Sequence, residues 1–282
     1  MESVSTVNAL YRDKRRRVWE LDFLRGLAVI LMCFDHMMFD FAFINTWFSD
    51  FNSVNNRFME WMHEHALEYW RGSLHFYGHY IFVFVFLFLV GTSCAFSRDN
   101  VRRGAALGVF SLFFTGATFI VKAMGILDDG IVFGILHCIA LCILCAASVD
   151  NLTKWNKYVN IFVPLALGVA VCAAGVGMQY WNIGKPFDNT FTTAHMFDYI
   201  IGTRGFGDDW FGLFPQVGAV LLGVYFGKAA YSTRLSLLPA LDGKWNKPFR
   251  FVGRHALLFY AIHQVAIAGL VILLGLCLGY RL

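Results

Sequence analysis

The sequence predicts an all-α membrane protein, a polytopic helix bundle with about seven transmembrane helices and an amphipathic helix at the outer interface. Two features of the composition lead to this fold class. The chain has 282 residues, of which 58% are hydrophobic and 15% are charged, whereas soluble domains contain about a quarter charged residues. Several apolar runs also approach the roughly 20 residues that an α-helix needs to cross a bilayer.

The expected transmembrane helices form a single domain over residues 1–282. The predicted spans are residues 20–42, 79–97, 104–122, 131–149, 158–178, 211–229 and 254–277. The first span follows the basic stretch "RDKRRR", as the apolar region of a signal peptide would. The span is too long for such a region and no small-residue cleavage site follows it, so we expect a retained first helix.

Lysine and arginine are distributed unevenly between the loops. With the N-terminus inside, the inner segments hold 16 of these residues and the outer segments hold six. Cytoplasmic loops of membrane proteins carry such an excess. We therefore expect a cytoplasmic N-terminus and a C-terminus outside. The net charge of +4 follows from this topology and predicts no binding of nucleic acid.

Two outer segments are long for so small a protein. In residues 45–78, apolar and aromatic side chains from Phe58 to Trp70 recur at helical spacing, which predicts an amphipathic helix in the outer interface. Residues 179–210 contain "GTRGFGDDW" and are expected to form an ordered loop. Outer segments of this size suggest that something binds outside.

The first span carries several ionisable residues. At about 100° per residue, Asp22, Arg25, His36 and Asp40 fall on one stripe of the helix, and Asp35 points about 100° away from His36. An ionisable group at bilayer depth costs a few kcal/mol, so it usually faces protein or a water-filled cavity. The stripe is therefore predicted to form one wall of a transmembrane cavity.

Simpler interpretations exist for each of these residues. Asp22 and Arg25 are spaced to pair at i, i+3 near the inner surface, and Arg25 is also long enough to reach the headgroups. Asp35 could make only an interhelical hydrogen bond. His36, taken alone, would be interpreted as a satisfied core histidine.

Further histidines lie at the depth of the spans. His79 opens the second span, His137 lies in the outer third of the fourth, and His263 lies near the middle of the seventh. Histidine titrates near neutral pH and can accept, donate or carry a proton. Together with His36, these residues favour proton handling or acyl transfer close to the outer face.

Five stretches resemble the heparan-α-glucosaminide N-acetyltransferase family, within the wider transmembrane acyltransferase superfamily. In order they are "ELDFLRGLAVILMCFDH", "FLFLVGTSCAFSR", "FGILHCIAL", "DDWFGLFPQVGAVLLGVYFGK" and "GRHALLFYAIHQ". The resemblance is closest to small bacterial members. It implies an enzyme in the bacterial cytoplasmic membrane that moves an acetyl group from cytosolic acetyl-CoA to an amino-sugar or glycan acceptor on the outer face. It also favours a homodimer.

The resemblance places the catalytic residues near the outer ends of the first spans. The family has an Asn late in its first helix, and this position falls on His36. His79 is expected to be the catalytic histidine after the first helix, although His75, His65 and His63 compete for this role. Asp35 is expected to orient a neighbouring histidine. The histidine would act either as a general base or as a nucleophile that forms an acetyl-imidazole.

The distribution of charge and the stripe of the first span suggest where such substrates would bind. A basic inner surface would hold the nucleotide of acetyl-CoA by charge-assisted hydrogen bonds, and the arm of acetyl-CoA would follow the stripe of the first span. The predicted acetyl-CoA residues are Asp22, Arg25, His137, Arg98, Arg102, Arg103, Arg254 and His263. The predicted acceptor residues are Arg71, Asp208, Asp209 and Trp210. For Trp210, anchoring to lipid headgroups is an equal alternative.

Three other functions fit parts of the pattern. A proton-coupled transporter of small solutes would use the same intramembrane histidines and aspartates, but the sequence contains no internal repeat or pair of broken helices. A metal-dependent enzyme would use His63, His65, His75 and His79, of which the last two are spaced i, i+4. No nearby cysteine completes such a site, and we expect no metal. A membrane sensor without catalysis is the third.

Overall fold

The computed structural model describes residues 18–125, 130–181, 187–188, 190–207 and 209–282, most of which are helical. The helices are α2 (Trp19–Ala42), α3 (Arg57–Arg71), α4 (Ser73–Cys94), α5 (Asn100–Ala123), α6 (Ile135–Thr153), α7 (Lys157–Trp181), α8 (Met196–Ile201), α9 (Gln216–Ala230), α10 (Lys247–Arg254) and α11 (Ala256–Cys277). Strands β1 (Phe187–Asp188) and β2 (Gly205–Phe206) pair in parallel. The predicted all-α fold class is confirmed.

Five helices in the described part of the chain are long and apolar enough to cross a membrane, namely α4, α5, α6, α7 and α11. The other two predicted spans also form helices. Helix α2 has 24 residues but carries acidic residues and Arg25, and α9 is apolar but has only 15 residues. The membrane helix bundle is therefore confirmed, and the number of seven spans stays a prediction.

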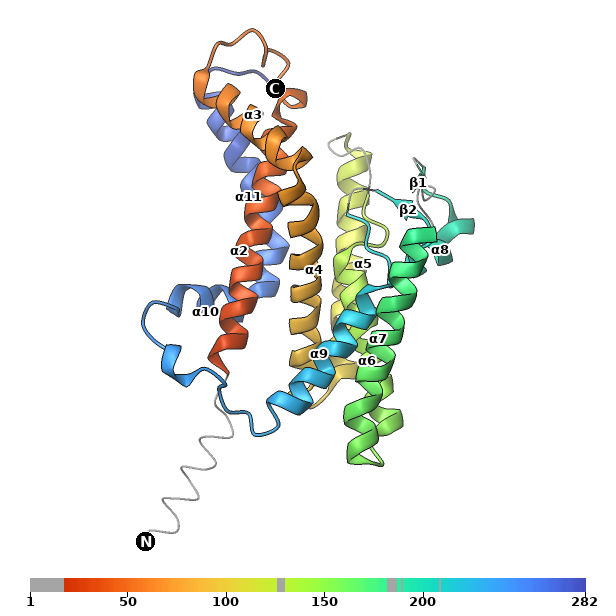
Figure 1. Cartoon of the computed structure of the whole chain (residues 1–282). Helices are drawn as coiled ribbons and strands as arrows, with labels where there is room; N and C mark the ends of the chain where they lie inside the picture. Colours follow the sequence, from red (N-terminus) through yellow and green to blue (C-terminus); the bar gives the residue numbers. More distant parts are fainter. Residues whose placement is uncertain (1–17, 126–129, 182–186, 189, 208) are drawn as a thin grey trace. The chain divides into compact units, whose positions relative to one another are not determined.

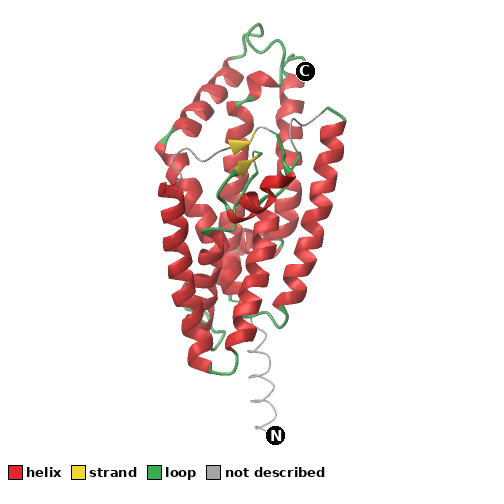
Figure 2. Cartoon of the chain, turned by 90° about the vertical axis from the view of Figure 1, so that its right-hand side faces the viewer, coloured by secondary structure: helices red, strands yellow, loops and turns green. Residues whose placement is uncertain are grey.

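The chain divides into two compact units, which are described separately. Unit 1 comprises residues 1–86 and 234–282, and unit 2 comprises residues 87–233. The boundary falls within α4, and the prediction of a single domain stays a prediction. Figure 2 shows that helices dominate the chain and that the two strands form only a small element. Both strands belong to unit 2.

Unit 1 is organised around α2, which contacts α3, α10 and α11 (Figure 1). At the C-terminal end of α2, a cluster of buried side chains includes Phe41, Phe48, Met59 and Tyr280. The backbone N–H of Ser49 donates a hydrogen bond of 3.0 Å to the carbonyl of Arg281. The C-terminal residues therefore fasten the loop that follows α2.

Helices α2 and α10 approach each other through two glycines. A Cβ atom on Gly26 would collide with the carbonyl oxygen of Phe249, and a Cβ atom on Gly253 would collide with the carbonyl oxygen of Asp22. Small residues at such positions let helix backbones come into direct contact. This contact places Arg254 beside the first turns of α2.

Unit 2 contains two pairs of packed helices, α5 with α6 and α7 with α9, and α6 also contacts α7 and α9. A polar cluster ties three of these helices together. The Lys228 ammonium group of α9 donates to the Asp150 carboxylate of α6 at 2.6 Å and to the Asn160 side-chain oxygen of α7 at 2.7 Å. Every partner in this cluster is satisfied within the unit, so it acts as a structural tie.

Three elements differ from the predictions. Helix α4 begins at Ser73, six residues before the predicted start of the second span at residue 79. The prediction was late because Ser73 and His75 lower the hydropathy of the first turns. Helix α10 lies in a segment that was expected to be an inner loop. The helix was not predicted because it is short and its sequence mixes basic with aromatic residues. The segment 179–210, which was expected to be an ordered loop, contains α8 and the β1–β2 pair in its described part.

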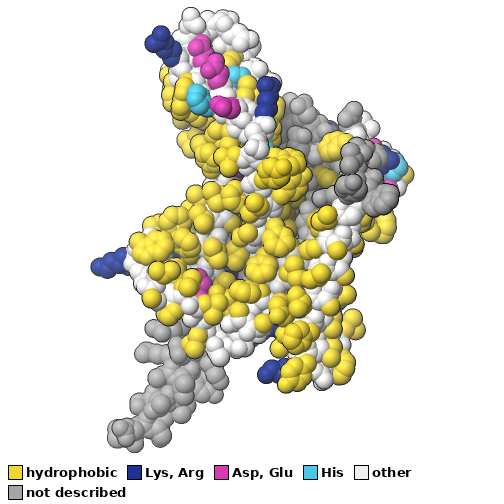
Figure 3. Space-filling model, in the orientation of Figure 1, with side chains coloured by type: hydrophobic (Ala, Val, Ile, Leu, Met, Phe, Trp, Pro, Cys, Tyr) yellow, Lys and Arg dark blue, Asp and Glu magenta, His cyan; other side chains and the backbone are white. Residues whose placement is uncertain are grey.

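The surface of unit 1 separates side chains by type. Figure 3 shows acidic, basic and histidine side chains gathered over α3, whereas hydrophobic side chains cover much of the long helices. In α3, Met59 and Ala66 are buried while Glu64 and His65 are exposed. The predicted amphipathic helix is therefore present, and its location at the outer interface stays a prediction.

Candidate active site

A cluster of polar side chains surrounds Asp35 in unit 1. The Tyr69 hydroxyl donates a hydrogen bond of 2.9 Å to Asp35 Oδ1, and His75 Nδ1 lies 2.9 Å from the same oxygen. His79 Nδ1 lies 3.6 Å from Asp35 Oδ2. The Asp35 and His75 side chains are only 14% and 15% exposed, so this carboxylate–imidazole pair is largely shielded from solvent.

Three helices hold these side chains in place. Because α4 begins at Ser73, His75 and His79 lie one turn apart on the same helix and both face Asp35 of α2. Helix α3 supplies Tyr69 and also Trp70, whose ring stacks on His75 with centroids 4.0 Å apart. The His75 ring is therefore fixed by the carboxylate at one edge and by an indole across its face.

This arrangement prepares an imidazole for proton transfer. A carboxylate that accepts a hydrogen bond from Nδ1–H fixes the tautomer that leaves the Nε2 lone pair free to act, and it stabilises the imidazolium that forms. Burial and the hydrogen bond to Asp35 both raise the pKa of Tyr69 above its usual range. Tyr69 therefore remains a hydrogen-bond donor to Asp35 at neutral pH.

The structure places His36 in a second group, away from the Asp35 contacts. His36 Nδ1 lies 3.0 Å from the carbonyl oxygen of Met32, and its ring makes an edge contact with His263 at 4.6 Å between centroids. One turn further along, the Gln264 side chain donates a hydrogen bond of 2.9 Å to Asp40. This part of the predicted stripe therefore contacts α11.

The inner part of the stripe forms an ion-paired group. Arg25 donates to Asp22 Oδ1 at 2.7 Å, so the i, i+3 pair that the sequence allowed is present. Arg254 Nε lies 3.2 Å from Asp22 Oδ2. The buried Asp22 carboxylate thus lies between two guanidinium groups, of which Arg254 is the more exposed.

Four predicted acetyl-CoA residues belong to unit 2. His137 Nε2 lies 3.1 Å from the Thr115 hydroxyl, in the contact between α5 and α6. Arg98, Arg102 and Arg103 are exposed around the start of α5. These three arginines lie close together in the sequence of unit 2.

The predicted acceptor residues are distributed over both units. Arg71 is exposed at the end of α3 in unit 1. In unit 2, the Trp210 indole N–H donates a hydrogen bond of 2.8 Å to the carbonyl oxygen of Tyr199. Asp209 is half-buried, and its carboxylate accepts a hydrogen bond from the backbone N–H of Ile135 at the start of α6. Asp208 lies outside the described residues.

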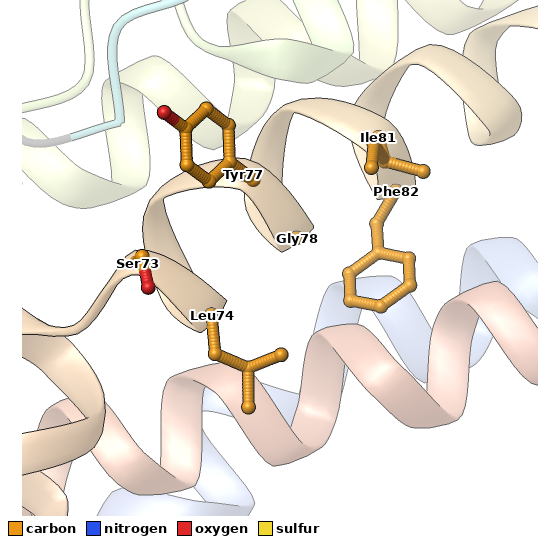
Figure 4. Close-up of a pocket in the computed structure, with 6 residues that line it drawn as sticks. All are labelled: Ser73, Leu74, Tyr77, Gly78, Ile81 and Phe82. Atoms are coloured by element: carbon orange, nitrogen blue, oxygen red, sulfur yellow. The ribbon is translucent and has the colours of Figure 1, made fainter.

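A groove on the surface of α4 has a different character from the Asp35 cluster. Figure 4 shows that its lining residues all come from this helix, and they are Ser73, Leu74, Tyr77, Gly78, Ile81 and Phe82. The lining is almost entirely apolar and includes neither His75 nor His79. Within the described ranges, no group of three or more His, Cys, Asp and Glu side chains is placed to hold a metal ion.

The sequence was then compared with known proteins. It matches the model of a family described as heparan-alpha-glucosaminide N-acetyltransferase, catalytic, over residues 17–63 and 58–265. The chain belongs to this family. Comparisons with curated proteins and with solved structures gave no match. The family match supports membrane acetyltransferase activity, and it includes every residue of the Asp35 cluster.

In this member of the acetyltransferase family, the residues around Asp35 are only partly those that the sequence predicted. Asp35 and His79 were expected and are near each other, but His75 was only a competing candidate and Tyr69 was not assigned to the site. Two signals were available. His75 and His79 share the i, i+4 spacing of one helix face, and Tyr69 lies on the apolar face of the amphipathic helix, where a hydroxyl needs a partner.

The stability of unit 2 is expected to depend on pH through Asp209. Burial raises the pKa of its carboxyl from 3.8 to about 7, against the opposing effect of the hydrogen bond from Ile135. Between about pH 4 and pH 7 the folded state therefore binds a proton that the unfolded state has lost, and this contribution to stability falls as the pH rises through the window. We expect Asp209→Asn to flatten the pH dependence of thermal unfolding in this range.

The measurement is the unfolding midpoint in detergent as a function of pH, followed by tryptophan fluorescence. Asp198→Asn, which replaces an acid of α8 with an exposed side chain, is the matched control and should retain the wild-type slope. An unchanged slope in Asp209→Asn would contradict the assignment.

Proposed function

We propose that the protein transfers an acetyl group from acetyl-CoA to an amine or hydroxyl of a sugar or glycan on the outer face of the membrane. Family membership supports the acetyltransferase class, and five long apolar helices support a location in the bilayer. The observation that carries the proposal is the hydrogen bond between Asp35 and His75, because it prepares an imidazole for acyl transfer.

His75 is proposed to act as the general base. Its Nε2 removes a proton from the acceptor as the acceptor attacks the thioester carbonyl, and Asp35 stabilises the resulting imidazolium. The same proton then passes to the sulfur of the departing coenzyme A, so the net reaction yields the acetylated acceptor and free thiol. A nucleophilic His75 would instead form an acetyl-imidazole before the acceptor reacts.

His79 is proposed to assist His75. Its Nδ1 is 3.6 Å from Asp35 Oδ2, which is longer than the 2.9 Å contact of His75. The second imidazole places another titratable group within reach of the same carboxylate. A role for His36 in catalysis also stays a prediction, because its ring contacts His263 and not Asp35.

The coenzyme A moiety is proposed to bind through basic residues near the predicted inner ends of the helices. In unit 1, Arg25 and Arg254 flank Asp22 and are one candidate site; in unit 2, the exposed arginines at the start of α5 are a separate candidate. Guanidinium groups bind phosphate through charge-assisted, bidentate hydrogen bonds. The predicted N-terminus inside and C-terminus outside would place this binding on the cytoplasmic side.

The test uses purified protein in liposomes, with radiolabelled acetyl-CoA on one side and glucosamine on the other. The expected result is labelled N-acetylglucosamine in the acceptor compartment together with release of coenzyme A thiol. Oriented vesicles should be active only when acetyl-CoA is on the side of the N-terminus. Solute accumulation driven by a pH gradient without acetyl-CoA would instead favour the transporter, and absence of transfer to any amine or hydroxyl acceptor would contradict the proposal.

A further inference from the structure

Asp40 is a fully buried acid in the contact between α2 and α11 of unit 1. Its side chain has 0% exposure, and its Oδ1 accepts a hydrogen bond of 2.9 Å from Gln264 Nε2. Two further atoms of the same pair, Asp40 Oδ2 and Gln264 Oε1, are buried without a hydrogen-bond partner among the described residues.

The two unpaired atoms are complementary if one proton is added. Both are acceptors, and they belong to groups that already share a hydrogen bond. A proton on Asp40 Oδ2 would turn this oxygen into a donor, and Gln264 Oε1 is the unpaired acceptor of its existing partner. The acid and the amide would then form two reciprocal hydrogen bonds, as in a cyclic acid–amide pair. One proton would thus satisfy both atoms, and an unpaired buried polar group otherwise lowers stability.

The surroundings offer the ionised form little compensation. In the described part of the chain, Asp40 makes no ion pair with a lysine or arginine. The elements around it carry histidines, among them His36 one turn earlier on α2, His263 on α11, and His63 on α3, which contacts the carbonyl oxygen of Phe41. They also carry Asp35 on α2, Glu60, Glu64, Glu68 and Tyr69 on α3, and Tyr260 on α11. A carboxylate in such an apolar contact, without a cation, pays a large desolvation cost.

We propose that Asp40 and Gln264 form a proton-binding site, in which the carboxylic acid and the amide hold one proton inside the contact between α2 and α11. The proton comes from water and binds reversibly to the carboxylate, without any other change in bonding. The site is separate from the Asp35 cluster, and the inference does not rest on the acetyltransferase activity. It would place a neutral Asp40 on the same stripe as His36.

Infrared difference spectroscopy of the purified protein tests the site. At neutral pH, wild type minus Asp40→Asn should contain the carbonyl band of a protonated carboxylic acid, and this band should shift in heavy water. Glu64→Gln, which replaces an exposed acid of α3, is the control and should leave the band intact. A difference spectrum that contains the bands of a carboxylate instead would overturn the proposal.

A second variant separates this result from a folding defect. Asn at position 40 can donate to Gln264 Oε1 and accept from Gln264 Nε2, so Asp40→Asn should unfold within a few degrees of the wild type. In Gln264→Leu, the acid loses its acceptor, and its carbonyl band should move to higher frequency. An acid band that is identical in Gln264→Leu and wild type would also overturn the proposal.

Discussion

Replacing His75 with alanine is expected to lower acetyl transfer by about 10²- to 10⁴-fold, the usual contribution of a positioned general acid or base. The thermal unfolding midpoint should change little by comparison, because the ring contacts Trp70 of α3 and Asp35 of α2, and His75 itself is not a member of the buried core cluster. The measurement is the rate of coenzyme A release and acetyl-glucosamine formation in liposomes. Asp35→Asn should also lower the rate of acetyl transfer, since the imidazole would no longer be held by a carboxylate.

The control is His65→Ala in the same outer segment. His65 is exposed, and its Nδ1 lies 2.9 Å from the carbonyl oxygen of Trp61, so its loss should leave the rate unchanged. If His75→Ala retains the wild-type rate while His36→Ala or His79→Ala removes it, the base has been assigned to the wrong imidazole. If His75→Ala, His36→Ala and His79→Ala all retain the wild-type rate, none of these histidines is the catalytic base.

The second large effect is expected at the contact between α2 and α10. Gly26→Ala and Gly253→Ala should each destabilise unit 1 by at least the ~1–3 kcal/mol typical of overpacking, because the new methyl group meets backbone atoms that have no rotamer to change. Separation of α10 from α2 would also remove the contact of Arg254 with Asp22. Thermal unfolding in detergent measures the loss of stability.

A matched control exists on α11. A Cβ atom on Gly269 would meet nothing within 4 Å, so Gly269→Ala should stabilise the helix by about 0.5–1 kcal/mol. If Gly26→Ala and Gly269→Ala shift the unfolding midpoint in the same direction, the close approach of α2 and α10 does not limit stability.

Hydropathy predicted the helices well because length and apolar character are local properties of the sequence. All seven predicted spans correspond to helices, and five of them meet the criteria of length and apolarity within the described residues. The start of α4 was placed too late because Ser73 and His75 lower the local hydropathy without breaking the helix. Helix α10 was missed because its stability comes from a tertiary contact, in which Gly253 packs on the backbone of α2.

The site was predictable only in part, because helical periodicity gives directions but not partners. The geometry of α2 correctly separated Asp35 from the stripe that carries His36. The role of Asp35 depends on Tyr69 and His75, which come from helices whose packing the sequence does not specify. The contacts of His36 and Asp40 with α11 depend in the same way on a helix more than 200 residues later.

The glycine contact between α2 and α10 also has a consequence for the order of events during synthesis. Unit 2 is a continuous stretch that is complete at residue 233, whereas unit 1 needs residues from both ends of the chain. When α2 leaves the ribosome, Arg25 is already present three residues after Asp22 and can offset its charge, but Gly253 and Arg254 do not yet exist. Asp22 therefore has its first guanidinium partner, Arg25, as soon as α2 is made, and gains the second, Arg254, only after residue 254 has been synthesised.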